Sequence, residues 1–418
     1  MTPNKKHVII GCGPAALSAL DTIRRLGSDD EITVVSREDS LPYSPAVLPY
    51  LLAGKADESD LFPRNGDYFS KRGVAFVRGQ EAVRVLPDRR QVVYRNGETE
   101  QYDTLLIACG AESIAQPVHD SGEGELLNFH TFDDYRRLRD QIKDGCDVTV
   151  LGAGMVAVEL AVALIERGCD VRIIGRGRPL RAYFDEEAGG HIRAILVDRG
   201  MKIITGKSIS HVRRSHGGFG IACADGEVFE TSVVVSCLGV RPNLSLVQGA
   251  GISANQGVLV DRHMRTNAEG VYAAGDVVEA PSFLNGSPGV CAVLPEAIAQ
   301  GKVAGANIAG RETGYEGWIP MNLLKFFGHS AFSIGMAMPA PGCGEMLEKK
   351  DKQERCFERL VVRDGRLIGA MFVNVDIDPG VISYLIKRRV NVGAYGHALL
   401  EQPADVSRWL MLKAERNG

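Results

Sequence analysis

The sequence predicts an α/β fold with two Rossmann-like units and a smaller α+β domain towards the C-terminal end. Two segments share one order of features: an apolar strand, a glycine-rich turn, a helix and a second strand. They begin at His7 and Val148. After Ala309 the pattern changes, and short β-like segments replace the alternation of strands and helices. Because alternating strands and helices favour parallel, doubly wound sheets, we expect two such sheets and a third body.

The first unit begins with the strand His7–Ile10, which leads into the turn GCGPAA at residues 11–16. A helix to about Leu26 and the strand Ile32–Val35 follow. This order is the context in which G-x-G-x-x-G/A binds a dinucleotide. The first glycine permits the tight turn, the second lets the pyrophosphate approach the backbone, and the third small residue lets the helix pack on the strand. These positions hold Gly11, Gly13 and Ala16.

The second unit repeats the order with the strand Val148–Leu151, the turn GAGMVA at residues 152–157, a helix to about Arg167 and the strand Val171–Ile174. In such a unit the phosphates lie on the free N–H groups of the helix N-terminus, where the helix dipole favours negative charge. Ordinary tight turns of an α/β protein are the alternative. Two copies in the same context favour two dinucleotide sites.

Charge and hydrophobic pattern argue against a nucleic-acid-binding or membrane protein. A formal net charge of −4 argues against nucleic acid or an anionic membrane as the main partner. The apolar run Val148–Ile165 contains Gly152, Gly154 and Glu159, and is better explained as a buried strand, turn and helix than as a membrane span. The N-terminal residues lead into the first strand without a separate apolar signal region, so we expect a soluble, cytoplasmic protein.

The cysteines give no local signature of a redox or metal site. There are nine, and no two form a CxxC pair. That pattern does not predict a dithiol centre, an iron–sulfur cluster, a zinc site or a disulfide framework, so we expect no metal. Small buried residues in a reducing compartment are the expected role of most of them.

Short β segments fill the chain around the two units. Between them we expect four strands, and a β-rich stretch, Lys202–Val235, follows the second unit. The C-terminal part shows three β-like segments, a helix at Val381–Arg389 and an amphipathic tail helix from Pro403. Outside the two units and the β-rich stretch, the seven expected strands are Val74–Val77, Val83–Leu86, Val92–Arg95, Thr104–Ile107, Phe332–Ile334, Arg359–Val362 and Leu367–Phe372.

The residue after the second strand usually selects the ribose of a dinucleotide, with an acid about 20 residues beyond the glycine turn. In the first unit Glu38 is near this spacing, although a solvated loop acid is the alternative. In the second unit no acid is present, and Arg176 and Arg178 could hold a 2′-phosphate. This pattern alone favours NADP over NAD, with two solvated loop arginines as the alternative.

Taken together, the motifs resemble the FAD- and NAD(P)-dependent pyridine nucleotide–disulfide oxidoreductase superfamily. The segment 105–110, LLIACG, is similar to the crossover out of its FAD domain, with Cys109 in place of threonine. The segment 235–243, VSCLGVRPN, is similar to the return into that domain. The strand that ends at Asp276 and the helix LPEAIAQGKVAGAN at 294–307 complete the resemblance. It implies domains at 1–112 with 242–316 for FAD, 113–241 for NAD(P), and 317–418 as a C-terminal interface domain.

The resemblance also implies the roles of individual residues. Asp276 would bind the flavin ribityl chain, and the helix at 294–307 would direct its positive end at the flavin. Glu159 would lie near the nicotinamide and is a catalytic candidate, with a stray helix acid as the alternative. The FAD site would comprise Gly11, Gly13, Pro14, Ala15, Ala16, Ser36, Arg37, Glu38, Ala82, Ala108, Cys109, Gly110, Gly275, Asp276, Glu296 and Ala297. The NAD(P) site would comprise Gly152, Gly154, Met155, Val156, Glu159, Arg176, Arg178 and Gly239.

Departures from the family pattern point to one branch. There is no CxxxxC, and Ala46 stands where single-cysteine members place their redox cysteine before Leu-Pro-Tyr. The ferredoxin- and rubredoxin-reductase branch often has a lysine near the flavin where this chain has Tyr50, so Tyr50 is a catalytic candidate, with a core tyrosine as the alternative. The same alignment puts Arg37 at the ribose-acid position, which competes with Glu38.

Without a redox cysteine, flavin is the remaining redox centre. Flavin exchanges a hydride with nicotinamide and single electrons with iron–sulfur centres, so we expect an iron–sulfur protein or subunit as partner, in an oligomer or hetero-complex. The stretch Leu41–Lys55 also resembles the FAD-containing, NAD-reducing subunits of phenylglyoxylate dehydrogenase-type 2-oxoacid oxidoreductases of anaerobic aromatic degradation. This favours NAD. A stand-alone NADH:ferredoxin or rubredoxin reductase, an NADH oxidase and a redox-sensing flavoprotein scaffold are the alternatives.

Overall fold

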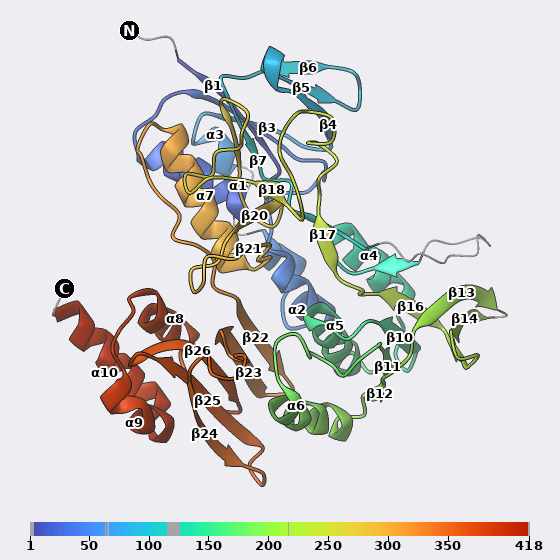
Figure 1. The fold of residues 1–418 in the computed structure, drawn as a ribbon. Coiled ribbons are helices and arrows are strands. Elements are labelled where there is room, and N and C mark those ends of the chain that lie inside the picture. The colour runs from blue at the N-terminus through green and yellow to red at the C-terminus, as the bar shows by residue number, and fades with distance from the viewer. Residues whose placement is uncertain (1–3, 63, 65–66, 115–125, 216, 417–418) are drawn as a thin grey trace. The chain divides into compact units, whose positions relative to one another are not determined.

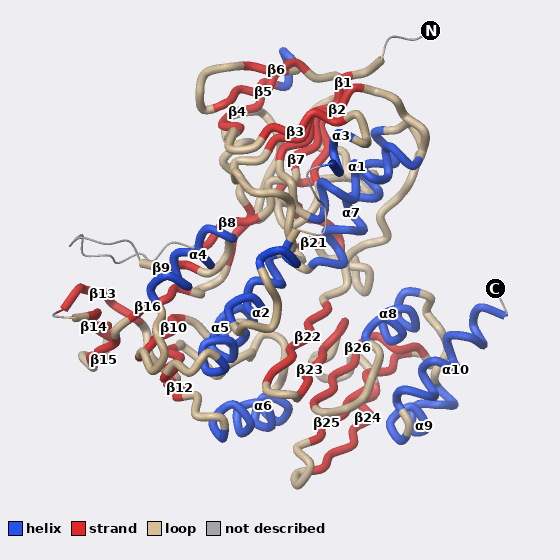
Figure 2. Tube along the Cα trace, turned by 180° about the vertical axis from the view of Figure 1, so that it is seen from behind, coloured by secondary structure: helices blue, strands red, loops and turns tan. Residues whose placement is uncertain are grey.

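The computed structural model describes residues 4–62, 64, 67–114, 126–215 and 217–416. The chain divides into two compact units, each described here by itself (Figures 1 and 2). Unit 1 comprises residues 1–47, 56–112 and 240–319, and unit 2 comprises residues 48–55, 113–239 and 320–418. The α/β class expected from the sequence is confirmed.

Unit 1 is built on a parallel sheet with the strand order β19-β7-β1-β2-β3. The central strands are apolar and buried, as the sequence pattern predicts. Helix α1 follows the glycine turn and packs against α7 (Figure 1). The elements are β1 (Lys6–Ile10), α1 (Pro14–Arg25), β2 (Glu31–Val35), β3 (Val74–Val77), β7 (Thr104–Ile107), β19 (Val271–Ala273) and α7 (Leu294–Ile308).

The contact between α1 and α7 depends on two glycines one helical turn apart. A Cβ atom on Gly301 would lie 2.2 Å from the carbonyl oxygen of Ala15, and one on Gly305 would lie 2.4 Å from that of Ala19. Both distances are far inside van der Waals contact, so the two backbones meet directly. This packing holds the middle of α7 against the first two turns of α1.

Smaller elements complete unit 1. An antiparallel sheet is formed by β4 (Ala82–Leu86), β5 (Gln91–Tyr94) and β6 (Thr99–Gln101), of which the sequence predicts only the first two. The remaining elements are the short helix α3 (Asp67–Ser70), the sheet of β18 (Val258–Leu259), β20 (Val278–Pro281) and β21 (Pro288–Gly289), and the ribbon of β8 (Ala111–Ser113) and β17 (Val240–Pro242).

Unit 2 contains a second parallel sheet with the order β12-β11-β10-β16-β9. Helix α2 (Leu48–Leu52) contacts α5, although the sequence assigns its residues to the FAD domain. The elements are β9 (Leu127–Asn128), α4 (Phe132–Gln141), β10 (Asp147–Leu151), α5 (Met155–Glu166), β11 (Asp170–Ile174), α6 (Glu186–Asp198), β12 (Lys202–Ile204) and β16 (Val233–Ser236), with a three-stranded sheet of β13 (Ile209–Ser215), β14 (Gly218–Cys223) and β15 (Val228–Thr231).

The C-terminal part of unit 2 is an antiparallel sheet with the order β22-β23-β26-β25-β24 and three helices (Figure 2). Two of its strands were not predicted, because β24, EMLEKKD, is largely exposed and polar, and the adjacent Leu323 and Leu324 interrupt the apolar–polar alternation of the β22 sequence. The elements are β22 (Met321–Phe326), β23 (His329–Gly335), β24 (Glu345–Asp351), β25 (Cys356–Arg363), β26 (Arg366–Val373), α8 (Pro379–Lys387), α9 (Gly396–Glu401) and α10 (Pro403–Arg416).

The boundaries between the two units lie near residues 47, 55, 112, 240 and 319. Residues 320–418 group with 113–239, so the separate third domain stays a prediction. Across the described ranges, no helix is both long and apolar enough to cross a membrane.

Candidate functional site

The first glycine turn begins where β1 ends. Gly11 has φ +105°, a conformation that side chains with a Cβ rarely adopt. Its N–H donates to the carbonyl of Val35 at 2.8 Å. A Cβ atom here would lie 2.1 Å from the carbonyl oxygen of Ala108. Only glycine therefore fits where the ends of β1, β2 and β7 converge.

The second turn repeats this geometry at the end of β10. Gly152 has φ +122°, and its N–H donates to the carbonyl of Ile174 at 2.9 Å. A Cβ atom would lie 2.2 Å from the carbonyl oxygen of Cys237. Two segments far apart in the sequence thus form the same strand–turn–helix junction.

The second glycine of each turn faces open space. Gly13 and Gly154 are the N-cap residues of α1 and α5, with ψ of −175° and −172°, and a Cβ atom on either would meet nothing within 4 Å. Neither helix start receives a side-chain cap from a described residue. Ala16 and Ala157 are buried against the strands behind. Each turn is thus a cradle of unsatisfied N–H groups beside empty space, which fits the pyrophosphate of FAD or of NAD(P)H.

Two candidates for the FAD ribose follow β2. Ser36 is buried, Arg37 is exposed and Glu38 is half-buried. Glu38 accepts a hydrogen bond from the Tyr43 hydroxyl at 2.8 Å. Burial raises the pKa of the Cys12 thiol to about 12, and the Glu38 charge adds to this rise against the opposing charge of Arg64. Glu38 is therefore close to the glycine turn and already oriented. This favours Glu38 over Arg37 as the residue that faces the FAD ribose.

The crossover that follows β7 runs beside the same turn. Ala108 is buried, and Gly110 has φ +68°. The Cys109 thiol donates to the carbonyl of Asn243 at 3.4 Å, and burial raises its pKa to about 12. Cys109 is thus a protonated packing residue at neutral pH. Ala82, another predicted FAD contact, begins β4 and pairs with Tyr94.

The start of α7 is held by a buried polar network. Gly275 has φ +86°, precedes Asp276, and its N–H donates to the Gln300 side chain at 2.8 Å. Ala297 is buried beside it. The Glu296 carboxylate, with 2% exposure, accepts from the Tyr315 hydroxyl at 2.5 Å and from the N–H of Ile319 at 3.4 Å. Glu296 therefore anchors the helix, and its predicted contact with FAD stays a prediction.

Two tyrosines lie within electrostatic range of Glu159 on α5: Tyr50 on α2 and Tyr183 in the loop before α6. Burial raises the pKa of Glu159 to about 7. Burial also raises the pKa of Tyr50 and of Tyr183, and in both the Glu159 charge adds to the rise. Lys55 pairs with Glu166 at 2.6 Å and fastens the Tyr50 segment to α5.

The two catalytic candidates, Tyr50 and Glu159, therefore lie near each other within unit 2. Tyr50 is 41% exposed, which argues against the alternative of a core tyrosine. Tyr183 was missed because it comes from the loop before α6, which carries no motif. A partly buried carboxyl with a pKa near neutrality, flanked by phenols, is typical of a functional site.

The arginines after β11 have different surroundings. Arg178 donates from Nη2 to the carbonyl of Phe184 at 2.6 Å, and its guanidinium packs on Gly189 of α6. Arg176 is exposed. Arg176 is thus better placed than Arg178 for a 2′-phosphate. The other predicted contacts are Met155, half-buried, Val156, 43% exposed, and Gly239, which has φ +109° and accepts from the N–H of Ile114 at 3.0 Å.

A buried arginine links the C-terminal sheet to the start of α6. Arg359 on β25 is 9% exposed at its side chain and pairs with Asp185 at 2.5 Å and with Glu348 at 2.6 Å. Asp185 is also the N-cap of α6, accepting from the N–H of Ala188 at 3.0 Å. Because Asp185 directly follows Phe184, this cluster braces the loop that carries the two arginines. No local sequence motif indicates this pairing.

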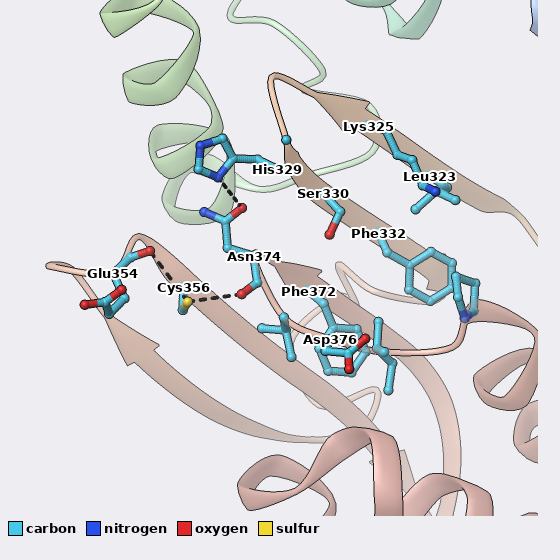
Figure 3. Close-up of a pocket in the computed structure, with 14 residues that line it drawn as sticks. Leu323, Lys325, His329, Ser330, Phe332, Glu354, Cys356, Phe372, Asn374 and Asp376 are labelled. Atoms are coloured by element: carbon cyan, nitrogen blue, oxygen red, sulfur yellow. Dashed lines mark hydrogen bonds between the residues drawn. The ribbon is translucent and has the colours of Figure 1, made fainter. Parts of the chain in front are cut away.

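A hollow of about 580 Å³ lies on the C-terminal sheet (Figure 3). There His329 Nδ1 meets the Asn374 side-chain oxygen at 3.0 Å, and the Cys356 thiol donates to the carbonyls of Asn374 and Glu354 at 3.2 and 3.6 Å. Its floor is formed by aromatic side chains of β23 and β26. It is lined by none of the predicted site residues.

Comparison with known proteins agrees with this geometry. The sequence pattern described as pyridine nucleotide-disulphide oxidoreductase matches residues 5–301. That of the rubredoxin NAD+ reductase C-terminal domain matches residues 320–378. The fold is similar to that of the covalent putidaredoxin reductase–putidaredoxin complex, with a TM-score of 0.82, 20% identity, and coverage of 94% of this chain and 99% of the other.

Two relatives extend the comparison. The NADH-dependent phenylglyoxylate dehydrogenase subunit epsilon of Aromatoleum evansii is 34% identical over 416 residues, which cover 98% of each chain. The NADH-rubredoxin oxidoreductase of Clostridium acetobutylicum is 30% identical over 331 residues, which cover 79% of this chain and 81% of the relative.

Proposed function

The chain belongs to the pyridine nucleotide-disulphide oxidoreductase family, and we propose that it transfers electrons between NADH and an iron–sulfur protein or subunit through bound FAD. FAD and a nicotinamide nucleotide are the cofactors of this oxidoreductase, and the two glycine cradles fit them. We assign FAD to the Gly11–Ala16 turn and the nicotinamide nucleotide to the Gly152–Ala157 turn.

The observation that carries the proposal is that the segment between β2 and α2 has an alanine, Ala46, at the position of the redox cysteine. Ala46 is exposed in the turn Pro45–Val47, where the disulfide-reducing members of the family would need a cysteine. Tyr50 follows on α2, beside Glu159. With no thiol at this position, substrate disulfides and peroxides lack their usual nucleophile, and the partner is an electron carrier.

The roles of the residues follow from their surroundings. The α1 and α5 N-termini hold the pyrophosphates, and Glu38 orients the FAD ribose. Bound flavin supplies hydride exchange with nicotinamide and one-electron exchange with iron–sulfur centres. Glu159, whose pKa burial raises to about 7, would hold a proton near neutral pH and offer a hydrogen bond to a bound nicotinamide, with Tyr50 nearby on α2. The N-terminus of α7 favours negative charge, because its N–H groups are held in place by the Glu296 network.

The more specific proposal is a subunit of a phenylglyoxylate dehydrogenase-type 2-oxoacid oxidoreductase complex, in which iron–sulfur subunits deliver electrons and NAD is reduced. It is supported by the Aromatoleum evansii relative, which matches this chain over 98% of both lengths. The resemblance of the Leu41–Lys55 segment to such NAD-reducing subunits is consistent with this proposal. A stand-alone NADH:rubredoxin reductase is the second candidate, because the Clostridium relative matches 79% of this chain.

Anaerobic stopped-flow measurements test the proposal. We expect NADH to bleach the flavin absorbance of the purified yellow protein rapidly, and a ferredoxin or rubredoxin to restore it. Fast turnover with oxygen alone, at the rate seen with either carrier, would instead identify an NADH oxidase. Very slow turnover with every carrier, together with a nucleotide-dependent change in assembly, would identify a flavoprotein scaffold. Native mass spectrometry of the complex from the source cell distinguishes a subunit from a stand-alone reductase.

A further inference from the structure

Two cysteines that are distant in the sequence meet at one end of the second parallel sheet. The Sγ atoms of Cys146 and Cys169 are 3.4 Å apart. Cys146 directly precedes β10, and Cys169 directly precedes β11. Both are free thiols. They lie away from the glycine turn, which follows the other end of β10.

The backbone places the two cysteines within reach of a disulfide. Asp147 and Asp170 are register partners in the parallel pair of β10 and β11, so the cysteines that precede them form the next pair outward. The N–H of Asp170 donates to the carbonyl of Cys146 at 2.9 Å, which continues the ladder to this point. Neighbouring strands are about 4.8 Å apart, and disulfides span Cα–Cα distances of roughly 4.4–6.8 Å. Only side-chain rotation is needed to join the sulfurs.

We propose that Cys146 and Cys169 form a dithiol modification site that closes to a disulfide by exchange with a low-molecular-weight disulfide, RSSR. The thiolate of Cys146 attacks one sulfur of RSSR, forms a mixed disulfide and releases RS⁻. The thiolate of Cys169 then attacks the Cys146 sulfur, completes the protein disulfide and releases the second RS⁻. The protein loses two electrons and two protons, and RSSR takes them up as two RSH.

The order of attack follows from exposure. Cys146 is half-buried, whereas Cys169 is 7% exposed, so Cys146 meets the reagent first. Burial and the neighbouring Cys146 raise the pKa of Cys169 to about 12, which makes it a slow resolving thiol. A metal site is not the better explanation, because the described residues contain no group of three or more potential Cys, His, Asp or Glu ligands.

A disulfide between Cys146 and Cys169 would enclose the second nucleotide-binding βα segment in a covalent ring. The ring from residue 146 to residue 169 encloses β10, the second glycine turn and α5 with Glu159. Because β10 has five residues, about 16 Å of strand separates the cysteines from the turn. The disulfide therefore leaves the cradle intact and restricts the unfolded chain, so the oxidised protein resists unfolding while it still accepts NADH.

Mass spectrometry of the FAD-loaded protein tests the site. After incubation with oxidised glutathione and alkylation, non-reducing trypsin digestion should give residues 144–167 linked to 168–172, and dithiothreitol should abolish the link. Cys343→Ala should give the same linked pair, whereas Cys146→Ala should not. Two thiols that remain alkylatable, or a glutathione adduct that stops on Cys146, would overturn the proposal.

A second measurement needs no substitution. The oxidised wild-type protein should unfold at a temperature several degrees higher than its reduced form, with NADH reduction of the flavin unchanged to within about twofold. An unfolding midpoint that does not rise despite the linked peptide would contradict the constraint inferred here. A large loss of NADH reduction would contradict the separation of the cysteines from the cradle. Neither outcome bears on the proposed electron transfer, so the two inferences fail separately.

Discussion

The two glycine turns have the same backbone and different surroundings. Gly11 and Gly152 both lie in left-handed backbone conformations, with a neighbouring carbonyl where a Cβ would be. Around the first turn are an acid, Glu38, and the directly packed helix α7. Around the second are arginines on the next loop and a proton-holding carboxyl, Glu159. The shared backbone geometry specifies a pyrophosphate, whereas the side chains around it determine which dinucleotide binds and whether a proton is held beside it.

The largest effect should come from filling the first turn. Gly11→Val combines a positive φ with a Cβ placed 2.1 Å from a backbone carbonyl, so the end of β1 must move. We expect loss of bound FAD and a stability decrease of about 3 kcal/mol or more. The flavin absorbance of the purified protein and urea unfolding measure both. A yellow, stable variant would show that this turn is not the FAD cradle.

Bulky residues at the second turn should separate the two sites. The double change Gly154→Val and Ala157→Leu fills the open cradle and the buried helix contact. We expect FAD to stay bound and NADH bleaching to slow by about 100-fold or more, because the nucleotide loses its place on the helix N-terminus. Gly13→Val is the matched control, which should lose FAD instead. The opposite pattern would mean that the two assignments are exchanged.

Glu159→Gln tests the role of the proton-holding carboxyl that distinguishes the second glycine turn from the first. A carboxyl whose folded pKa is raised to about 7 contributes stability below the unfolded pKa, and that contribution is lost as pH rises towards 7. We expect the wild type to lose at most about 3 kcal/mol between pH 4.5 and 7 relative to the variant. NADH bleaching by the variant should slow roughly tenfold to 100-fold and lose its pH dependence near pH 7. An unchanged pH profile would exclude Glu159 from this role.

The smallest effect is expected from the buried arginine that braces the loop before α6. Arg359→Met breaks the pair with Asp185, which caps α6 next to the arginine loop. We expect the KM for NADH to rise several-fold with kcat nearly unchanged, since the loop loses its brace while no residue of the glycine turn or beside Glu159 changes. Arg355→Met is the control, because its partner Asp198 lies at the far end of the same helix. Equal KM values for the two variants would mean that Arg359 does not position the loop.

Local sequence pattern predicts the parts of the molecule that depend on local chemistry. Both glycine turns and their strands follow from apolar runs and glycine spacing, and the structure has them within a residue or two at each end. The polar edge strand β24 was missed, because its residues resemble a loop and only pairing with β25 makes it a strand.

Contacts between segments that are distant in the sequence could not be predicted from local sequence pattern. The Tyr50 segment was assigned to the FAD domain but packs on α5 in unit 2, where Lys55 meets Glu166. Tyr183 comes within electrostatic range of Glu159 from a loop without a motif. The approach of Cys146 to Cys169 follows from strand register, since neither cysteine belongs to a spacing motif.

The central claim is that electrons pass between NADH and an iron–sulfur carrier through flavin alone. Its most direct test is anaerobic stopped-flow reduction by NADH, followed by reoxidation with ferredoxin or rubredoxin, before and after alkylation of the accessible thiols with iodoacetamide. We expect both rates to stay within about twofold of the untreated protein, because Ala46 stands where a redox cysteine would be. Loss of carrier reoxidation on alkylation, with flavin reduction intact, would contradict it.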